Sequence, residues 1–258
     1  MKNRKQVIDF LNRKYNDYNR PAFIESDPVQ VPHLFSKKAD IEIAGLFAAL
    51  FAWGNRTTII NKAKELMALM DHAPHDFVLQ HEEKDRKRFL LFKHRTFNAT
   101  DLLYFLEFLQ QHYRQSPSLE TAFLRGMKRG DKDVTGALDG FHRHFFSLDE
   151  APARTRKHVA APFRGSTCKR LNMYLRWMVR NDKRGVDFGI WKKISPAQLV
   201  IPIDLHVARV TQRLGILEQE KVNWQAALAL TDWLRGLDAD DPVKYDFALF
   251  ALGVIEKF

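Results

Sequence analysis

The chain has 258 residues, of which 45% are hydrophobic, so it can bury a core as one domain or as two closely packed lobes. Lys and Arg number 41 against 31 Asp and Glu, and the net charge of +10 favours a polyanionic partner, nucleic acid first and an anionic membrane surface second. The same charge is compatible with a basic protein that has no such partner. The single cysteine, Cys168, excludes intramolecular disulfides, multi-cysteine zinc sites and cysteine-ligated iron–sulfur clusters.

The first fifteen residues, MKNRKQVIDFLNRKY, are amphipathic and charged, and they lack the apolar centre of a signal peptide. No apolar run along the chain approaches the length of a membrane span. We therefore expect a cytoplasmic protein that has no membrane partner.

Apolar residues recur three or four positions apart in most of the chain, which predicts helices. The predicted helical segments are 40–54, 57–70, 100–114, 136–148, 168–180, 205–217, 223–237 and 242–255. Asp40, Asn223 and the pair Asp241-Pro242 stand where helices begin. Segment 24–35 is punctuated by prolines and predicts an extended stretch, and no segment alternates as a strand does. The predicted fold class is all-α.

The charged stretch HEEKDRKRF, residues 81–89, has two interpretations. It is either a joint between two lobes or the solvated face of a helix. The chain contains no repeat and no Gly/Ser-rich linker, so we treat residues 1–258 as a single helical unit of two closely packed lobes.

The stretch GSTCKRLN, residues 165–172, places cations where an isolated helix least favours them. Glycine and serine are typical of a turn and cap, and an apolar helical run follows. Arg164, Lys169 and Arg170 then lie beside the positive end of the helix dipole, which is unfavourable unless an anion binds there. A solvated lysine is the simpler interpretation of Lys169.

A second informative stretch is VIPIDLHVARVTQRLGIL, residues 200–217. A short apolar run leads to Asp204, and a helix is predicted directly after it. Asp204 is therefore a candidate N-cap. The same residue can also be a catalytic carboxylate, because the first turn of a helix lowers the pKa of an acid at this position.

Together these two stretches resemble the signature of the helix–hairpin–helix DNA glycosylases, the superfamily of endonuclease III and the 8-oxoguanine glycosylases. Gly165, Lys169 and Asn172 match the hairpin glycine, the lysine and the asparagine of its bifunctional members. The later segment matches the family pattern V-D-T-H-V-x-R-V-x-x-R-L-G at Asp204, His206, Val207, Arg209, Val210, Arg213, Leu214 and Gly215. Weaker likeness extends to residues 42–67 and to the C-terminal DPVKYDFALFALG.

The resemblance implies a two-lobed helix–hairpin–helix glycosylase-like fold and a base-excision DNA glycosylase with lyase activity. Lys169 would be the nucleophile that forms a Schiff base with the sugar, and Asp204 would stabilise the developing positive charge. The implied substrate is duplex DNA with a damaged base, such as an oxidised purine, bound by a monomer without cofactor or metal. The expected DNA-binding residues are Arg164, Gly165, Ser166, Thr167, Arg170, Lys183, Arg184, Lys192 and Lys193. The expected base-pocket residues are Trp53, Asn55, Arg56, Tyr245 and Asp246.

The sequence departs from the family pattern in three places. Thr167 replaces the second glycine of the hairpin, the cluster-binding cysteines of endonuclease III are missing, and Lys169 and Asp204 are 35 positions apart (204 minus 169). The archaeal 8-oxoguanine glycosylases share a widened interval and an unusual hairpin, so they are the most similar subgroup. The whole chain also resembles a bacterial family without assigned function.

Three functions follow as hypotheses. The leading one is a glycosylase with lyase activity. The first alternative is a non-catalytic DNA- or RNA-binding protein that keeps the glycosylase fold. The second is an interaction protein whose basic face meets an acidic partner. Steep salt dependence distinguishes a nucleic-acid partner, and trapping with borohydride distinguishes the enzyme from the binder.

Overall fold

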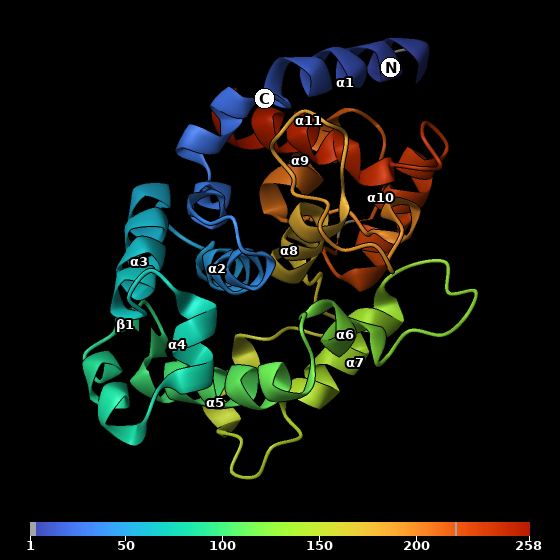
Figure 1. Cartoon of the computed structure of the whole chain (residues 1–258). Helices are drawn as coiled ribbons and strands as arrows, with labels where there is room; N and C mark the ends of the chain where they lie inside the picture. The colour runs from blue at the N-terminus through green and yellow to red at the C-terminus, as the bar shows by residue number, and fades with distance from the viewer. Residues whose placement is uncertain (1–3, 220) are drawn as a thin grey trace. The chain divides into compact units, whose positions relative to one another are not determined.

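The computed structural model describes residues 4–219 and 221–258, and this part of the chain is mostly helical (Figure 1). The helices are α1 (Arg4–Tyr18), α2 (Lys38–Phe51), α3 (Arg56–Leu69), α4 (Pro74–Gln80), α5 (Ala99–Gln115), α6 (Glu120–Leu124), α7 (Thr135–Phe145), α8 (Lys169–Val179), α9 (Leu205–Arg213), α10 (Trp224–Arg235) and α11 (Asp246–Phe250). A π-helical turn, Ala251–Ile255, continues α11. The prediction of an all-α chain is confirmed. Within the described residues no helix has both the length and the apolar character needed to cross a membrane.

The chain divides into two compact units. Unit 1 consists of the residues up to Phe23, Lys128–Gly136 and Ala161–Phe258, and unit 2 consists of Ile24–Met127 and Ala137–Ala160. Segment 81–89 lies inside unit 2, where Glu83–Phe89 forms a 3₁₀ helix with Phe89 buried. The interpretation of this segment as a joint between lobes is therefore wrong.

Unit 2 is built around α2, which is buried from Ala39 to Phe51 and is apolar from Ile43 onward. Helices α3 and α4 pack against α2, and α5 packs against α4. The aromatic core is dense, with ring centroids of Phe105 and Phe145 4.5 Å apart and those of Phe108 and Phe145 4.6 Å apart. The expected cap at Asp40 is wrong, because α2 begins at Lys38 and the Asp40 carboxylate accepts the backbone N–H of His75 at 2.8 Å.

Two short features of unit 2 differ from the sequence prediction. Strands β1 (Lys93–His94) and β2 (Phe97–Asn98) form an antiparallel hairpin that is too short to show alternation. The proline-punctuated stretch 24–35 is a series of 3₁₀ turns rather than an extended segment. Asp27 caps one of these turns by accepting the N–H of Val29 at 3.0 Å, and proline supplies the first residue.

In unit 1, α1 and α9 both pack against α11, and α10 packs against the 3₁₀ turn Pro242–Tyr245 that precedes α11 (Figure 1). The segment after α8 is bound to the end of that helix. The N–H groups of Phe188 and Trp191 each donate at 2.8 Å to the carbonyls of Trp177 and Met178, which a helix C-terminus leaves without intrahelical partners. The ring of Trp191 also meets Tyr174 edge to face at 5.4 Å. Residues 181–199, which lie between the lysine and aspartate motifs, are thus a packed part of unit 1.

Candidate functional site

The turn before α8 uses two left-handed residues. Gly165 has φ of +73° and ends the 3₁₀ turn Pro162–Arg164, a conformation that glycine adopts without steric cost. Cys168, with φ of +51°, directly precedes the helix. The Ser166 hydroxyl oxygen accepts the N–H of Cys168 at 3.1 Å, and the Asn172 amide donates to the Thr167 carbonyl at 3.1 Å. Side chains at both ends of the turn therefore fix where α8 begins.

Lys169 and Asp204 meet within unit 1. Lys169 Nζ donates to Asp204 Oδ2 at 2.5 Å, although the two residues are 35 positions apart. Both side chains are partly exposed, at 28% for Lys169 and 24% for Asp204. The ion pair is therefore accessible to a ligand.

Buried backbone anchors both members of this pair. Cys168, directly before Lys169, and Leu171, two positions after it, are each 1% exposed. Ile203, which precedes Asp204, is fully buried, and the N–H of Ile201 donates to the Thr231 hydroxyl at 3.1 Å. Side chains on well-packed elements hold their geometry more tightly than side chains on free loops.

The electrostatics keep Asp204 ionised. Burial alone would raise the pKa of Asp204, but the Lys169 ammonium and the N–H of Val207 outweigh burial and lower it below its ordinary value. Asp204 Oδ1 accepts the N–H groups of His206 and Val207, each at 2.9 Å, so Asp204 is the N-cap of α9 as expected. One carboxylate oxygen caps the helix and the other meets the lysine.

Sequence reasoning missed the charged cluster further along α8. Arg180 is 1% exposed, and its guanidinium reaches Asp187 at 3.0 Å, Asp182 at 2.7 Å and Asp241 at 2.9 Å. Asp187 also accepts from Arg176 at 3.3 Å and thus joins two successive turns of the helix. The sequence did contain a signal for this cluster, namely two arginines four positions apart in the apolar stretch RWMVR. Arginines on a buried helix require acidic partners, because a charged side chain is buried only when it is paired.

Arg176 connects this cluster to α11 through an ion pair with Asp246. Burial raises the pKa of Asp246 to about 6, although Arg176 and the charge of Lys169 both act to lower it. Tyr245 is buried, and its hydroxyl donates to Asn12 at 3.1 Å. Asp246 is therefore close enough to feel the charge of Lys169, whereas the hydroxyl of Tyr245 is bound to α1.

The residues expected to bind DNA differ in exposure. The exposed ones are Arg164, Gly165, Lys183, Lys192 and Lys193, and the half-buried ones are Ser166, Thr167 and Arg170. Burial lowers the pKa of Arg170 to about 10, which leaves it charged at neutral pH.

Arg184 differs from the other expected DNA-binding cations. It donates to the Asn16 side chain at 2.7 Å and lies over the ring of Tyr15 at 4.6 Å, so its hydrogen-bonding capacity is directed to α1. Arg184 thus packs against α1, and its contact with DNA stays a prediction.

Three expected base-pocket residues belong to unit 2. Asn55 is the N-cap of α3 and accepts the N–H of Thr58 at 3.1 Å. Trp53 is half-buried, with the guanidinium of Arg95 over its ring at 4.4 Å. Arg56 is half-buried in the first turn of α3. The structure thus assigns Asn55 a capping role and covers one face of Trp53.

Two exposed apolar side chains adjoin the motifs that carry Lys169 and Asp204. Leu205, at the first position of α9, is 61% exposed, and Phe163, in the turn before Gly165, is 55% exposed. Sequence reasoning did not select them, because an isolated apolar residue in a polar stretch is common on protein surfaces.

Among residues 4–219 and 221–258, no group of three or more His, Cys, Asp or Glu side chains is arranged to hold a metal ion. A family model described as a protein of unknown function (DUF2400) matches residues 27–255. The chain belongs to this family. No curated protein and no solved structure gives a match. Membership in this family assigns no reaction, so the chemistry has to be argued from the residues.

Proposed function

We propose that this chain is a base-excision DNA glycosylase with lyase activity, with the helix–hairpin–helix glycosylase-like fold and a cytoplasmic location. The observation that carries the proposal is the 2.5 Å contact between Lys169 Nζ and Asp204 Oδ2. A primary amine and an ionised carboxylate held together on buried backbone are the two groups that glycosyl transfer to a lysine requires.

In the proposed reaction, the Lys169 ammonium gives up one proton, its nitrogen bonds to the anomeric carbon of the damaged nucleotide, and the bond from that carbon to the base breaks. The base leaves with the bonding electron pair and takes up the proton that Lys169 released. Asp204 stays ionised and stabilises the positive charge on the sugar. Opening of the sugar ring then gives a Schiff base on Lys169, which borohydride reduces to a stable amine.

The turn before α8 would bind a DNA phosphate. Arg164 is exposed beside it, and the helix N-terminus favours an anion. Lys192 and Lys193, both exposed, would supply further phosphate contacts. Binding through phosphates predicts an affinity that falls steeply from low to physiological salt.

The test is a screen of the purified protein against duplexes that carry different damaged bases, with borohydride present. We expect a trapped adduct with at least one lesion, and none with Lys169→Gln, which keeps most of the DNA affinity because one cation among many is lost. Lys193→Gln is the matched control, since it removes one exposed lysine elsewhere in unit 1 and should still be trapped. Adduct formation by Lys169→Gln would assign the chemistry to another amine.

The second candidate is a non-catalytic DNA- or RNA-binding protein. The net charge of +10 and the exposed cations favour it equally. Salt-dependent DNA binding without any trapped adduct would support this candidate and contradict the enzyme.

A further inference from the structure

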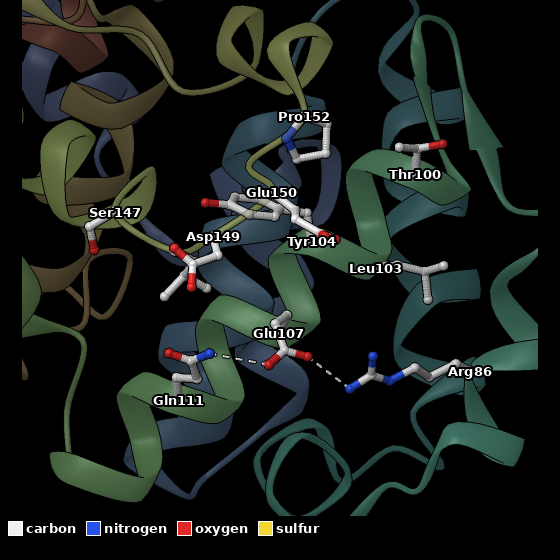
Figure 2. Close-up of a pocket in the computed structure, with 11 residues that line it drawn as sticks. Arg86, Thr100, Leu103, Tyr104, Glu107, Gln111, Ser147, Asp149, Glu150 and Pro152 are labelled. Carbon is white, nitrogen blue, oxygen red and sulfur yellow. Dashed lines mark hydrogen bonds and ion pairs between the residues drawn. The ribbon is translucent and has the colours of Figure 1, made fainter.

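An elongated groove runs along one face of α5 in unit 2. Its larger part is a cavity of about 610 Å³ between α5 and the loop of residues 147–152 (Figure 2). A second cavity of about 510 Å³ adjoins the first, and Arg86 and Leu103 line both. The residues that α5 contributes share one helical face and are Thr100, Leu103, Tyr104, Glu107 and Gln111. The eleven steps from Thr100 to Gln111 give a length of about 16 Å at 1.5 Å per residue.

The floor of this α5 groove is held by an ion pair. Glu107 accepts from Arg86 at 2.9 Å and from Gln111 at 3.2 Å, and Figure 2 shows Arg86 and Gln111 on opposite sides of Glu107. Burial raises the pKa of Glu107, but Gln111 and Arg86 outweigh burial and lower it below its ordinary value. The groove floor is therefore ordered and keeps a carboxylate ionised.

The loop wall of the α5 groove adds two carboxylates. Asp149 and Glu150 are exposed, and neither side chain has a hydrogen bond or an ion pair within the described residues. Acidic residues that line the groove are Glu83, Glu107, Asp149 and Glu150, against the cations Arg86 and Lys87. Four negative and two positive charges leave a net charge of −2, on a chain whose net charge is +10. This local charge repels a nucleic acid and attracts a cation.

The smaller cavity also offers apolar surface beside its charged residues. Leu90 is 57% exposed and lines the smaller cavity together with half-buried Leu103. Exposed leucine beside a groove leaves apolar area in water that a partner can cover. The groove therefore offers carboxylates to a positive charge and leucines to an apolar side chain.

We propose that the α5 groove binds a basic, partly apolar peptide segment of a partner protein. The segment places Arg or Lys side chains against Asp149 and Glu150 and an aliphatic or aromatic side chain on Leu90 and Leu103. A length of about 16 Å accommodates about five residues of extended peptide at roughly 3.3 Å each. This partner site lies in unit 2 and is independent of the proposed glycosylase reaction, whose lysine and aspartate lie in unit 1.

The experiment selects a phage-displayed library of random seven-residue peptides on the full-length protein. The selected peptides should be rich in Arg or Lys together with Leu, Ile or Phe. Synthetic copies, followed by fluorescence anisotropy, should bind at least tenfold more weakly to the double variant Asp149→Asn/Glu150→Gln. A second variant, Leu103→Asp, should also weaken the binding of the same peptides, because it removes apolar surface from the groove.

The matched control is Asp9→Asn/Glu25→Gln, which removes two exposed carboxylates outside the groove and should leave peptide binding unchanged. Selection of no peptide, selection of acidic or uncharged peptides, or equal weakening in the control would overturn the proposal. If duplex DNA displaces the peptides from the groove, the occupant is a nucleic acid. If the protein forms a dimer that Asp149→Asn/Glu150→Gln abolishes, the occupant is a second copy of the chain. Either result contradicts the proposal.

Discussion

Two ion-pair sites on α8 differ in burial, and the difference separates a structural role from a chemical one. Arg180, at the end of the helix, is 1% exposed and meets three carboxylates. Lys169, at the start, is 28% exposed and meets the single carboxylate of Asp204. Breaking a buried ion pair leaves uncompensated charge in the interior, whereas an exposed pair contributes little to stability. The Arg180 cluster therefore holds unit 1 together, and the Lys169–Asp204 pair is available for function.

The largest expected effect on folding comes from Arg180→Met. Asp187 is fully buried and would lose one of its two arginine partners, so we expect the free energy of unfolding to fall by about 3–5 kcal/mol. Urea denaturation followed by circular dichroism measures this. Lys169→Gln is the matched comparison and should change stability by about 1 kcal/mol or less. Equal stability of the two variants would remove the distinction between the two sites.

Asp204→Asn separates function from folding at the partly exposed Lys169–Asp204 pair. Asparagine caps a helix about as well as aspartate, so stability should hardly change. Loss of the carboxylate charge removes stabilisation of the cationic sugar, and base release should slow by about 10²–10³-fold under single-turnover conditions. Unchanged base release would show that the Asp204 carboxylate acts only as a helix cap.

The raised pKa of Asp246, which pairs with Arg176 in the buried cluster, makes the stability of the folded protein depend on pH. Its folded-state pKa of about 6 lies above the ordinary value of 3.8, so the folded protein binds the proton more tightly. The stabilisation from this proton is complete below pH 3.8 and is lost as the pH rises through about 6. A shift of about two pKa units corresponds to about 3 kcal/mol.

The measurement compares wild type with Asp246→Asn. The stability of wild type relative to this variant should decrease between pH 4 and pH 7 in urea titrations, with Arg176, Asp187 and Lys169 as the neighbouring charges that set the size of the change. A constant difference across this range would contradict burial as the cause of the raised pKa.

The smallest expected effect concerns the helix cap. Asp204→Ala should lower the free energy of unfolding by about 1 kcal/mol, because the N–H groups of His206 and Val207 lose their acceptor. Asp204→Asn is the control for the same site. If alanine and asparagine are equally stable in thermal denaturation, the cap does not contribute to α9.

The cap role of Asp204 followed from its local sequence, whereas its pairing with Lys169 was implied only by the resemblance to the glycosylases. An N-cap is a local property, so Asp204 and Asn223 were found at the starts of their helices from neighbouring residues alone. The partners of Arg180 include Asp241, which is 61 positions away, and no local pattern encodes that contact.

The same limit explains other contacts that the sequence did not reveal. The partners of Arg184, Asn16 and Tyr15, come from α1, far from its own segment in the sequence. Asp40 was expected to begin a helix, but its carboxylate serves His75, 35 positions later. The α5 groove likewise combines Glu107 with a loop some forty positions further along the chain, which periodicity does not reveal.

The most direct test of the central claim is the identity of the amine in a trapped adduct. Wild-type protein is incubated with lesion-containing duplex DNA and borohydride, digested with a protease, and analysed by mass spectrometry. The account predicts that the sugar remnant is attached to Lys169 Nζ. Attachment to another lysine or to the N-terminal amine, or no adduct with any lesion, would contradict it.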